Sequence, residues 1–211
     1  MSKKSGIEGV LFDIGGVLLD FDHMLSCRRI AALAELDYLD YKEVYKRLFA
    51  SGLETEFDLG LPTELFYSRA LEALGSSPEA ISYEVFIEIW GAIFTERPEM
   101  KEIVAELRGN TRRLILSNTN AIHYSYIEEH FSWFKEFEAS FLSFKLGIRK
   151  PDPAIFEAVI ESTGLTPRSI LYIDDIESHV MAAKEAGIEA VLFTTTDALR
   201  AVLKEAGLLK P

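Results

Sequence analysis

Short apolar runs that alternate with helical patterns most constrain the fold of this chain. The apolar runs occupy residues 7–12, 113–116, 169–173 and 190–193. The helical patterns occupy residues 99–108, 152–163, 176–186 and 197–206. A glycine follows each helical pattern, as is common where a helix ends. This alternation predicts an α/β fold with a doubly wound parallel sheet and helices on both faces.

A long segment separates the first apolar run from the second. It contains about a hundred residues, far more than one crossover helix requires. Asp40 and Glu43 have the spacing of a capping box, and Pro62 opens a further helical pattern that ends before Gly75. Residues 82–94 are rich in large apolar side chains. We therefore predict a helical cap at residues 20–95, inserted into a core formed by residues 1–19 and 96–211.

Composition and charge limit the classes of partner. The chain has 211 residues, of which 48% are hydrophobic, enough for a substantial core. Its net charge of -12 argues against nucleic-acid or anionic-membrane partners, although a small anionic ligand needs only a local binding site. Cys27 is the single cysteine, which excludes an intramolecular disulfide, and no apolar run is long enough to span a membrane. We expect a cytoplasmic protein and make no prediction of its oligomeric state.

A carboxylate and two glycines follow the first apolar run directly. An aspartate in the position of Asp13 is often only the start of a turn. The functional alternative is a nucleophile at the carboxyl end of a parallel strand, the edge where open α/β sheets bind ligands. Gly15 and Gly16 would then let the backbone approach a phosphate group closely.

Three further groups lie at strand ends or in loops. Ser117 and Asn118 follow the second run, where they either form a turn or helix cap or bind phosphoryl oxygens. Lys150 is either a solvated charge or the cation that offsets repulsion between a carboxylate and a phosphate. Asp174 and Asp175 end the third run, and two adjacent carboxylates there are costly unless they share a cation. Oxygen ligands of this kind predict Mg²⁺.

Taken in order, these segments resemble the four motifs of the haloacid dehalogenase superfamily of hydrolases, in its branch with a helical cap. The matching residues are 12–18, 116–119, 149–152 and 172–175. Within that superfamily the chain looks most like bacterial phosphatases that act on α-D-glucose 1-phosphate. The resemblance implies an aspartyl-phosphate intermediate on Asp13, which water then hydrolyses.

The resemblance also implies roles for the other residues. Asp13, Ser117 and Lys150 would be catalytic. Phosphate binding would fall to Gly15, Gly16, Ser117, Asn118 and Lys150. Mg²⁺ would be held by Asp13, the Gly15 carbonyl and Asp175, with Asp174 nearby.

The chain departs from the superfamily pattern at two positions. Most phosphatases of the superfamily carry an aspartate two residues after the nucleophile, which transfers protons, whereas this chain has Gly15. Because glycine cannot transfer a proton, we expect a slow enzyme, one restricted to good leaving groups, or a substitute donor. Asp20 and Asp22 are candidate substitutes, with a plain surface role as the alternative. His179 stands where the family often has an acid, and the other histidines show no metal-ligand spacing.

Three functions compete on these observations. The first is an Mg²⁺-dependent phosphatase of small phosphorylated metabolites, sugar 1-phosphates among them. The second is a metal-independent 2-haloacid dehalogenase, against which Asp174 and Asp175 argue. The third is a scaffold that binds phosphorylated metabolites without turnover, for which Gly15 is the only support.

Overall fold

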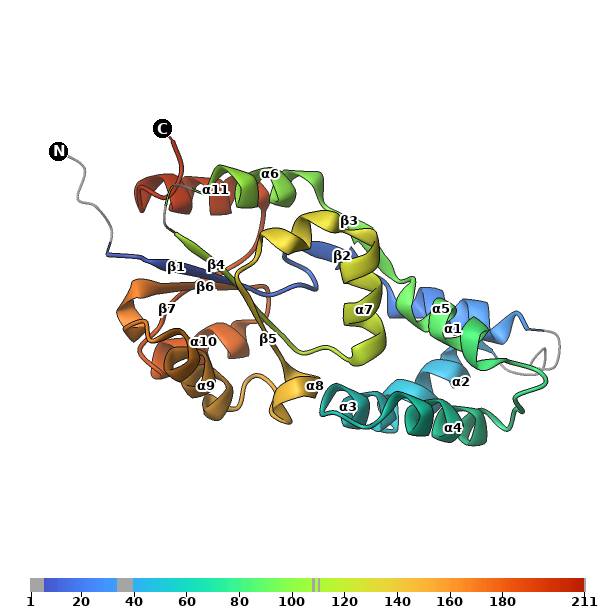
Figure 1. Cartoon of the computed structure of the whole chain (residues 1–211). Coiled ribbons are helices and arrows are strands. Elements are labelled where there is room, and N and C mark those ends of the chain that lie inside the picture. The colour runs from blue at the N-terminus through green and yellow to red at the C-terminus, as the bar shows by residue number, and fades with distance from the viewer. Residues whose placement is uncertain (1–5, 34–39, 108, 110, 211) are drawn as a thin grey trace.

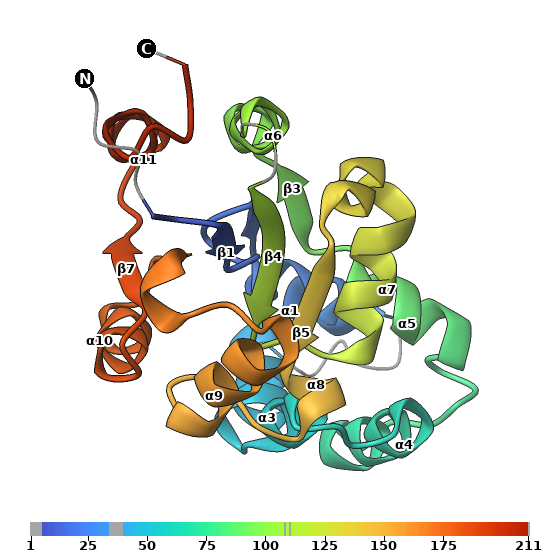
Figure 2. The same cartoon turned by 60° about the vertical axis from the view of Figure 1, so that its left-hand side comes forward.

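A computed structural model of the protein describes residues 6–33, 40–107, 109 and 111–210. A five-stranded sheet of order β5-β4-β1-β6-β7 lies at its centre (Figure 2), and every neighbouring pair is parallel. The chain therefore starts in the middle of the sheet and extends it on both sides, which confirms the predicted fold class. The strands are β1 (Gly9–Phe12), β4 (Arg112–Ser117), β5 (Ala139–Leu142), β6 (Ile170–Asp174) and β7 (Glu189–Leu192).

Helices cover both faces of this sheet. They are α6 (Pro98–Glu106), α7 (Ala121–His130), α8 (Ser143–Leu146), α9 (Pro153–Thr163), α10 (Glu177–Glu185) and α11 (Thr196–Glu205). Successive residues of β1 point to opposite faces, so Val10 and Phe12 pack with α6, α7 and α11. Leu11 packs on the other face with α9 and α10. Burial on both faces explains why β1 is apolar along its whole length.

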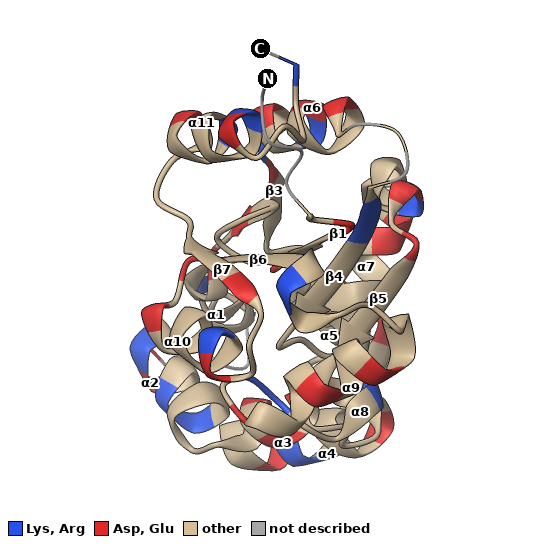
Figure 3. Cartoon of the chain, turned by 90° about the vertical axis from the view of Figure 1, so that its left-hand side faces the viewer, with Lys and Arg blue, Asp and Glu red and all other residues tan. Residues whose placement is uncertain are grey.

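The helices that cover the sheet carry charged residues. Acidic and basic residues are mixed along α6 and α11, which lie side by side (Figure 3). Arg200 of α11 joins them, because its Nη1 atom is 2.6 Å from Oε2 of Glu106. Among the residues that the structure describes, no helix has the length and apolar character needed to cross a membrane.

The helices within residues 23–91 form a second body with its own interior (Figure 1). We call α1 to α5 the cap helices. Their bounds are α1 (His23–Ala31), α2 (Tyr41–Tyr45), the π-helical turn Lys46–Ala50, α3 (Leu53–Asp58), α4 (Thr63–Leu74) and α5 (Tyr83–Gly91). Phe66 stacks on Phe57 with ring centroids 4.1 Å apart and contacts Trp90 edge-on at 4.8 Å. Ile122 of α7 belongs to the same cluster, which joins this interior to the core.

A two-stranded antiparallel ribbon stands where the chain enters and leaves the cap helices. Its strands are β2 (Leu19–Phe21) and β3 (Phe94–Glu96). The apolar residues at 82–94 therefore do not all lie in one helix, since α5 ends at Gly91 and Phe94 starts β3. Asp40 does cap α2, because its carboxylate accepts a hydrogen bond from the Lys42 amide at 3.3 Å. The boundaries 20–95 of a cap domain stay a prediction.

The edge strand β5 was missing from the sequence prediction. Ala139–Leu142 is short, and Ser140 interrupts its apolar residues. Its pairing with β4 stabilises it, and such a long-range contact leaves no local pattern. The helix expected at 99–108 extends to Glu106, and Arg108 lies outside the described residues.

Candidate active site

Asp13 lies at the carboxyl end of the central strand. Its backbone amide donates to the Ile173 carbonyl at 3.0 Å, which continues the pairing of β1 with β6. Its carboxylate is buried and accepts a hydrogen bond from the Ile14 amide at 2.7 Å. The neighbouring strands end in Ser117 and Asp174, so the parallel sheet brings these side chains to the same edge.

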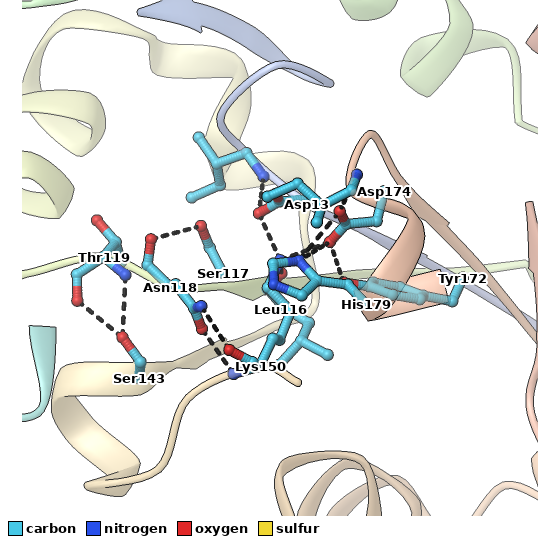
Figure 4. A network of polar contacts seen from close by, with 12 residues as sticks. Asp13, Leu116, Ser117, Asn118, Thr119, Ser143, Lys150, Tyr172, Asp174 and His179 are labelled. Carbon is cyan, nitrogen blue, oxygen red and sulfur yellow. Dashed lines mark hydrogen bonds and ion pairs between the residues drawn. The ribbon is translucent and has the colours of Figure 1, made fainter. Parts of the chain in front are cut away.

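Lys150 connects the ends of β1 and β6. Its Nζ atom lies 2.9 Å from Oδ1 of Asp13 and 2.7 Å from Oδ2 of Asp174 (Figure 4). It also donates to the Leu116 carbonyl at 3.2 Å, and the side chain is buried. The Asn118 side chain holds the Lys150 backbone, accepting from its amide at 2.8 Å and donating to its carbonyl at 3.0 Å. Lys150 is therefore an internal cation, and the solvated-charge interpretation is wrong.

Asp174 is surrounded by hydrogen-bond donors. Tyr172 donates its hydroxyl to Oδ2, the Ile176 amide donates to Oδ1 at 2.8 Å, and Nδ1 of His179 lies 3.2 Å from both oxygens. Burial raises the pKa of Asp174, but the hydrogen bond from His179 and the charge of Lys150 outweigh it and hold that pKa far below its usual value. Asp174 thus stays ionised and fixes the position of Lys150.

Three carboxylates meet beside this lysine. One oxygen from each of Asp13, Asp174 and Asp175 lies within 4.8 Å of the others. Burial raises the pKa of Asp13 to about 6, although the charge of Lys150 lowers it, and burial followed by the charge of Asp174 raises the pKa of Asp175. One lysine offsets only one of these charges, and a hard divalent cation with oxygen ligands would offset the others. Because Mg²⁺ prefers oxygen ligands, these three clustered carboxylates fit that ion. Asp175 is the most exposed of the three.

The two glycines after Asp13 have different surroundings. Gly16 has φ +74°, and a Cβ atom there would lie 2.1 Å from Oδ2 of Asp175. Its amide donates to the Leu19 carbonyl at 2.9 Å. A Cβ atom on Gly15 would lie 2.9 Å from the ring of Phe21. Gly16 thus lets the loop pack against Asp175, and its contact with phosphate stays a prediction.

A cavity of about 770 Å³ opens above this edge of the sheet. The sheet side of its wall contains Asp13, Gly15, Ser117, Lys150 and Asp175. Asn118 lines it as well, whereas Gly16 and Asp174 do not appear in the wall. Among the described residues, the Ser117 hydroxyl makes only a long contact of 3.5 Å to the Asn118 carbonyl, outside the usual range for a hydrogen bond between oxygens. This hydroxyl is free to bind a phosphoryl oxygen.

The candidate substitutes for the missing aspartate lie elsewhere. Asp20 forms an ion pair with Arg97, and Asp22 caps α1 by accepting from the Met24 amide at 2.8 Å. Neither lines the cavity, and both are exposed. Asp20 and Asp22 are therefore surface residues and not substitutes for the missing aspartate.

The cap helices supply the opposite wall, and sequence reasoning gave those residues no site role. His23, Glu54 and Asp58 of the cap helices line it, together with Phe21 of β2. Glu54 and Asp58 are four residues apart on α3, a spacing that places them on one helix face. That spacing was visible in the sequence, but it does not show which face meets the core.

Comparison with known proteins identifies the class to which this fold and site belong. The family model of haloacid dehalogenase-like hydrolases matches residues 7–187, and the chain belongs to this family of hydrolases.

Individual relatives cover most of the chain. It is 27% identical over 191 residues to D-ribitol-5-phosphate phosphatase of Bacteroides thetaiotaomicron, covering 87% of this chain and 90% of that protein. It is 25% identical over 189 residues to the phosphorylated carbohydrates phosphatase of Thermotoga maritima, covering 88% and 84%. A magnesium complex of a haloacid dehalogenase family enzyme from B. thetaiotaomicron has a similar fold, with a TM-score of 0.76, 25% identity, and coverage of 90% and 94%.

Proposed function

We propose that this protein is an Mg²⁺-dependent phosphatase of small phosphorylated metabolites, with sugar and polyol phosphates as the substrate class. The observation that carries the proposal is the position of Lys150, between Asp13 and Asp174 and beside Asp175. A buried carboxylate beside a lysine and two further acids suits attack on a phosphate group. Relatives that act on ribitol 5-phosphate and phosphorylated carbohydrates support the substrate class.

Asp13 is the proposed nucleophile. One of its oxygens bonds to phosphorus while the bond to the leaving oxygen breaks, which gives an aspartyl phosphate that water then hydrolyses. The Lys150 ammonium, 2.9 Å from Asp13, reduces the repulsion between the carboxylate and an incoming phosphate dianion. The Ser117 hydroxyl donates to a phosphoryl oxygen, and Asn118 keeps Lys150 in place through its backbone.

Mg²⁺ would be held by Asp13 and Asp175, with the Gly15 carbonyl as a further ligand. Both oxygens of Asp174 already accept hydrogen bonds, so we assign it the task of orienting Lys150. The ion, when bound, would neutralise charge that develops on the phosphoryl group. The magnesium complex of the B. thetaiotaomicron enzyme supports this choice of metal. A cytoplasmic location remains our prediction from the sequence.

Phosphate release tests the proposal directly. The purified protein is assayed with ribitol 5-phosphate, glucose 1-phosphate and p-nitrophenyl phosphate, each with Mg²⁺ and with EDTA. We expect release that requires Mg²⁺ and falls by at least about 10⁴-fold in D13N. D197N, which changes an exposed aspartate on α11, is the control and should keep full activity.

Two results would contradict the proposal. Release of chloride from chloroacetate in EDTA would favour the metal-independent dehalogenase. Binding of phosphate esters without turnover of any substrate would favour the non-catalytic scaffold.

A further inference from the structure

The reaction needs a proton donor that the sheet edge does not provide. When the bond from phosphorus to a sugar oxygen breaks, the oxygen leaves as an alkoxide unless it receives a proton. Gly15 has no side chain to supply one, and the ring of Phe21 fills the space where a side chain would begin. We therefore expect a proton donor among the other described residues of the cavity wall.

Asp58 of α3 faces the same space from the opposite wall. It lines the main cavity together with Asp13 and Gly15, and it lines a smaller adjoining cavity together with Gly15 and Ser117. Its side chain is buried, with an exposed fraction of 4%. A carboxyl group in this position is placed for chemistry on the part of a substrate that extends from the phosphate toward the cap helices.

A chain of hydrogen bonds fixes Asp58 to the core. Nδ2 of Asn120 donates to Oδ1 of Asp58 at 3.1 Å and to Nδ1 of His123 at 3.0 Å. The amide orientation is set because Oδ1 of Asn120 accepts from the His123 backbone amide at 3.1 Å. Nε2 of His123 in turn donates to the Trp90 carbonyl at 3.1 Å. Asn120 lies three residues after Ser117. These hydrogen bonds therefore connect Asp58 to the loop that would bind phosphate.

The surroundings of Asp58 favour its protonated form. Burial and then the charge of Glu54 raise the pKa of Asp58 to about 8, although Asn120 and Arg149 lower it. Burial also raises the pKa of Glu54, which lies one helical turn before Asp58 on α3. Two neighbouring acids retain a proton more easily than one, so the pair favours a protonated state.

His23 and Asp152 also line the wall and are poorer donors. His23 has no hydrogen-bond partner for Nδ1 among the described residues, and burial lowers its pKa to about 4, so it carries no extra proton at neutral pH. Asp152 is exposed and caps α9 by accepting from the Ala154 amide at 3.0 Å. Asp13, Lys150 and Asp175 already have roles in the proposed reaction.

We propose that Asp58, with Glu54 as its partner, donates the proton that the leaving oxygen needs, in place of the acid that Gly15 cannot supply. This inference rests on the proposed phosphatase function. In the first step the Asp13 oxygen bonds to phosphorus, the electron pair of the broken bond goes to the leaving oxygen, and that oxygen takes the Asp58 proton. In the second step water attacks the aspartyl phosphate, its proton passes to the Asp58 carboxylate, and Asp13 is released.

The leaving group separates this role from a structural one. p-Nitrophenolate leaves without a proton, whereas a sugar or polyol alkoxide does not. For D58N we expect kcat with ribitol 5-phosphate to fall by about 10²–10⁴-fold, and kcat with p-nitrophenyl phosphate to change by less than about 10-fold. E56Q, an exposed substitution on the same helix, is the control and should leave both rates unchanged.

E54Q gives a second test that disturbs the cap helices less. Removing the Glu54 charge lowers the pKa of Asp58, so the alkaline limb of the kcat profile with ribitol 5-phosphate should move to lower pH. Arg149 on the neighbouring loop and His123 and His23 on the adjoining helices remain in place, so they do not account for the difference.

Three outcomes would overturn the inference. An equal loss with both substrates in D58N would show a structural role for Asp58. A raised KM with unchanged kcat for ribitol 5-phosphate would show binding of a substrate hydroxyl, and an unchanged rate would show no role. Each is distinguishable from failure of the proposed function, because wild-type turnover of p-nitrophenyl phosphate and its loss in D13N test the phosphatase without Asp58.

Discussion

The sheet edge buries charged side chains, whereas the cap helices bury aromatic and aliphatic ones. At the edge, Asp13, Lys150 and Asp174 are almost completely removed from solvent and hold one another through ion pairs. In the cap helices, Phe66 and Trp90 contribute to an apolar interior, and the buried Asp58 lies where that interior borders the cavity. Exact placement of side chains therefore matters most at the sheet edge, whereas the filled volume matters most inside the cap helices.

The two regions meet at one polar junction. Asp58 and Asn120 connect α3 to the loop after β4, and His123 connects that loop to α5. Changes of the cap interior should therefore reach the reaction through this junction, whereas changes of the edge act on the reaction itself.

The largest effect is expected for K150M. This substitution leaves Asp13 and Asp174 buried without their cation, so we expect a loss of about 3–5 kcal/mol in the free energy of unfolding. The rate of phosphate release should fall by at least about 10²-fold. Chemical denaturation and a phosphate assay measure the two effects. K184M, which changes an exposed lysine of α10, is the control, and normal activity in K150M would refute the assigned role.

W90A should destabilise the cap helices without a direct effect on the charged edge. Trp90 is buried against Phe66 and Phe86, and its truncation leaves a large void, so we expect a cost of about 3–5 kcal/mol. Hydrogen exchange should show faster opening of α4 and α5 and unchanged protection of β1 and β6. V85A, which truncates an exposed side chain on α5, is the control. Equal loss of protection in β1 would show that the two interiors unfold as one.

Gly16 and Gly52 offer a matched pair with one glycine in each region. Both have a positive φ, +74° and +89°, so alanine at either position should cost about 1–3 kcal/mol through backbone strain. Only at Gly16 would the new Cβ atom meet a side chain, Asp175, since nothing lies within 4 Å of that point at Gly52. We expect G16A to raise the Mg²⁺ concentration needed for half-maximal activity by about 10–100-fold, and G52A to leave it unchanged. Equal values in the two variants would contradict the role of Asp175 as a ligand.

The smallest effect concerns the pH dependence of the junction. Burial and then the charge of His23 lower the pKa of His123 from 6.5 to about 3. Between these two pH values, His123 binds a proton in the unfolded chain but not in the folded one. Stability from this histidine is complete above the unfolded value and is lost as the pH falls below it. Between pH 6 and pH 5 the wild type should lose about 1 kcal/mol more than H123Q. Denaturation at both pH values measures this, with H130Q at the exposed end of α7 as the control. Parallel pH dependence in wild type and H123Q would show that His123 is not buried in its neutral form.

The sequence predicted strands and site residues correctly where a local apolar pattern led directly to a residue of the site. Residues 170–174 are apolar and end in an acid, and the structure places that acid at the end of β6 beside Lys150. It failed for β5, which is short and stabilised mainly by its neighbour β4. It also gave Lys150 an alternative as a solvated charge, because burial of one lysine depends on two carboxylates far away in the chain.

By itself, the sequence determined the doubly wound sheet and the set of residues at its carboxyl edge. It does so because parallel strands end on the same side, so residues that follow the strands must meet there. Only the tertiary structure decided that Asp58 lines the main cavity above this edge and that Asp20 and Asp22 do not. The contact between Asp58 and Asn120 joins residues 62 positions apart, and it depends on how two separately packed interiors dock, for which neither helix period nor strand period carries a signal.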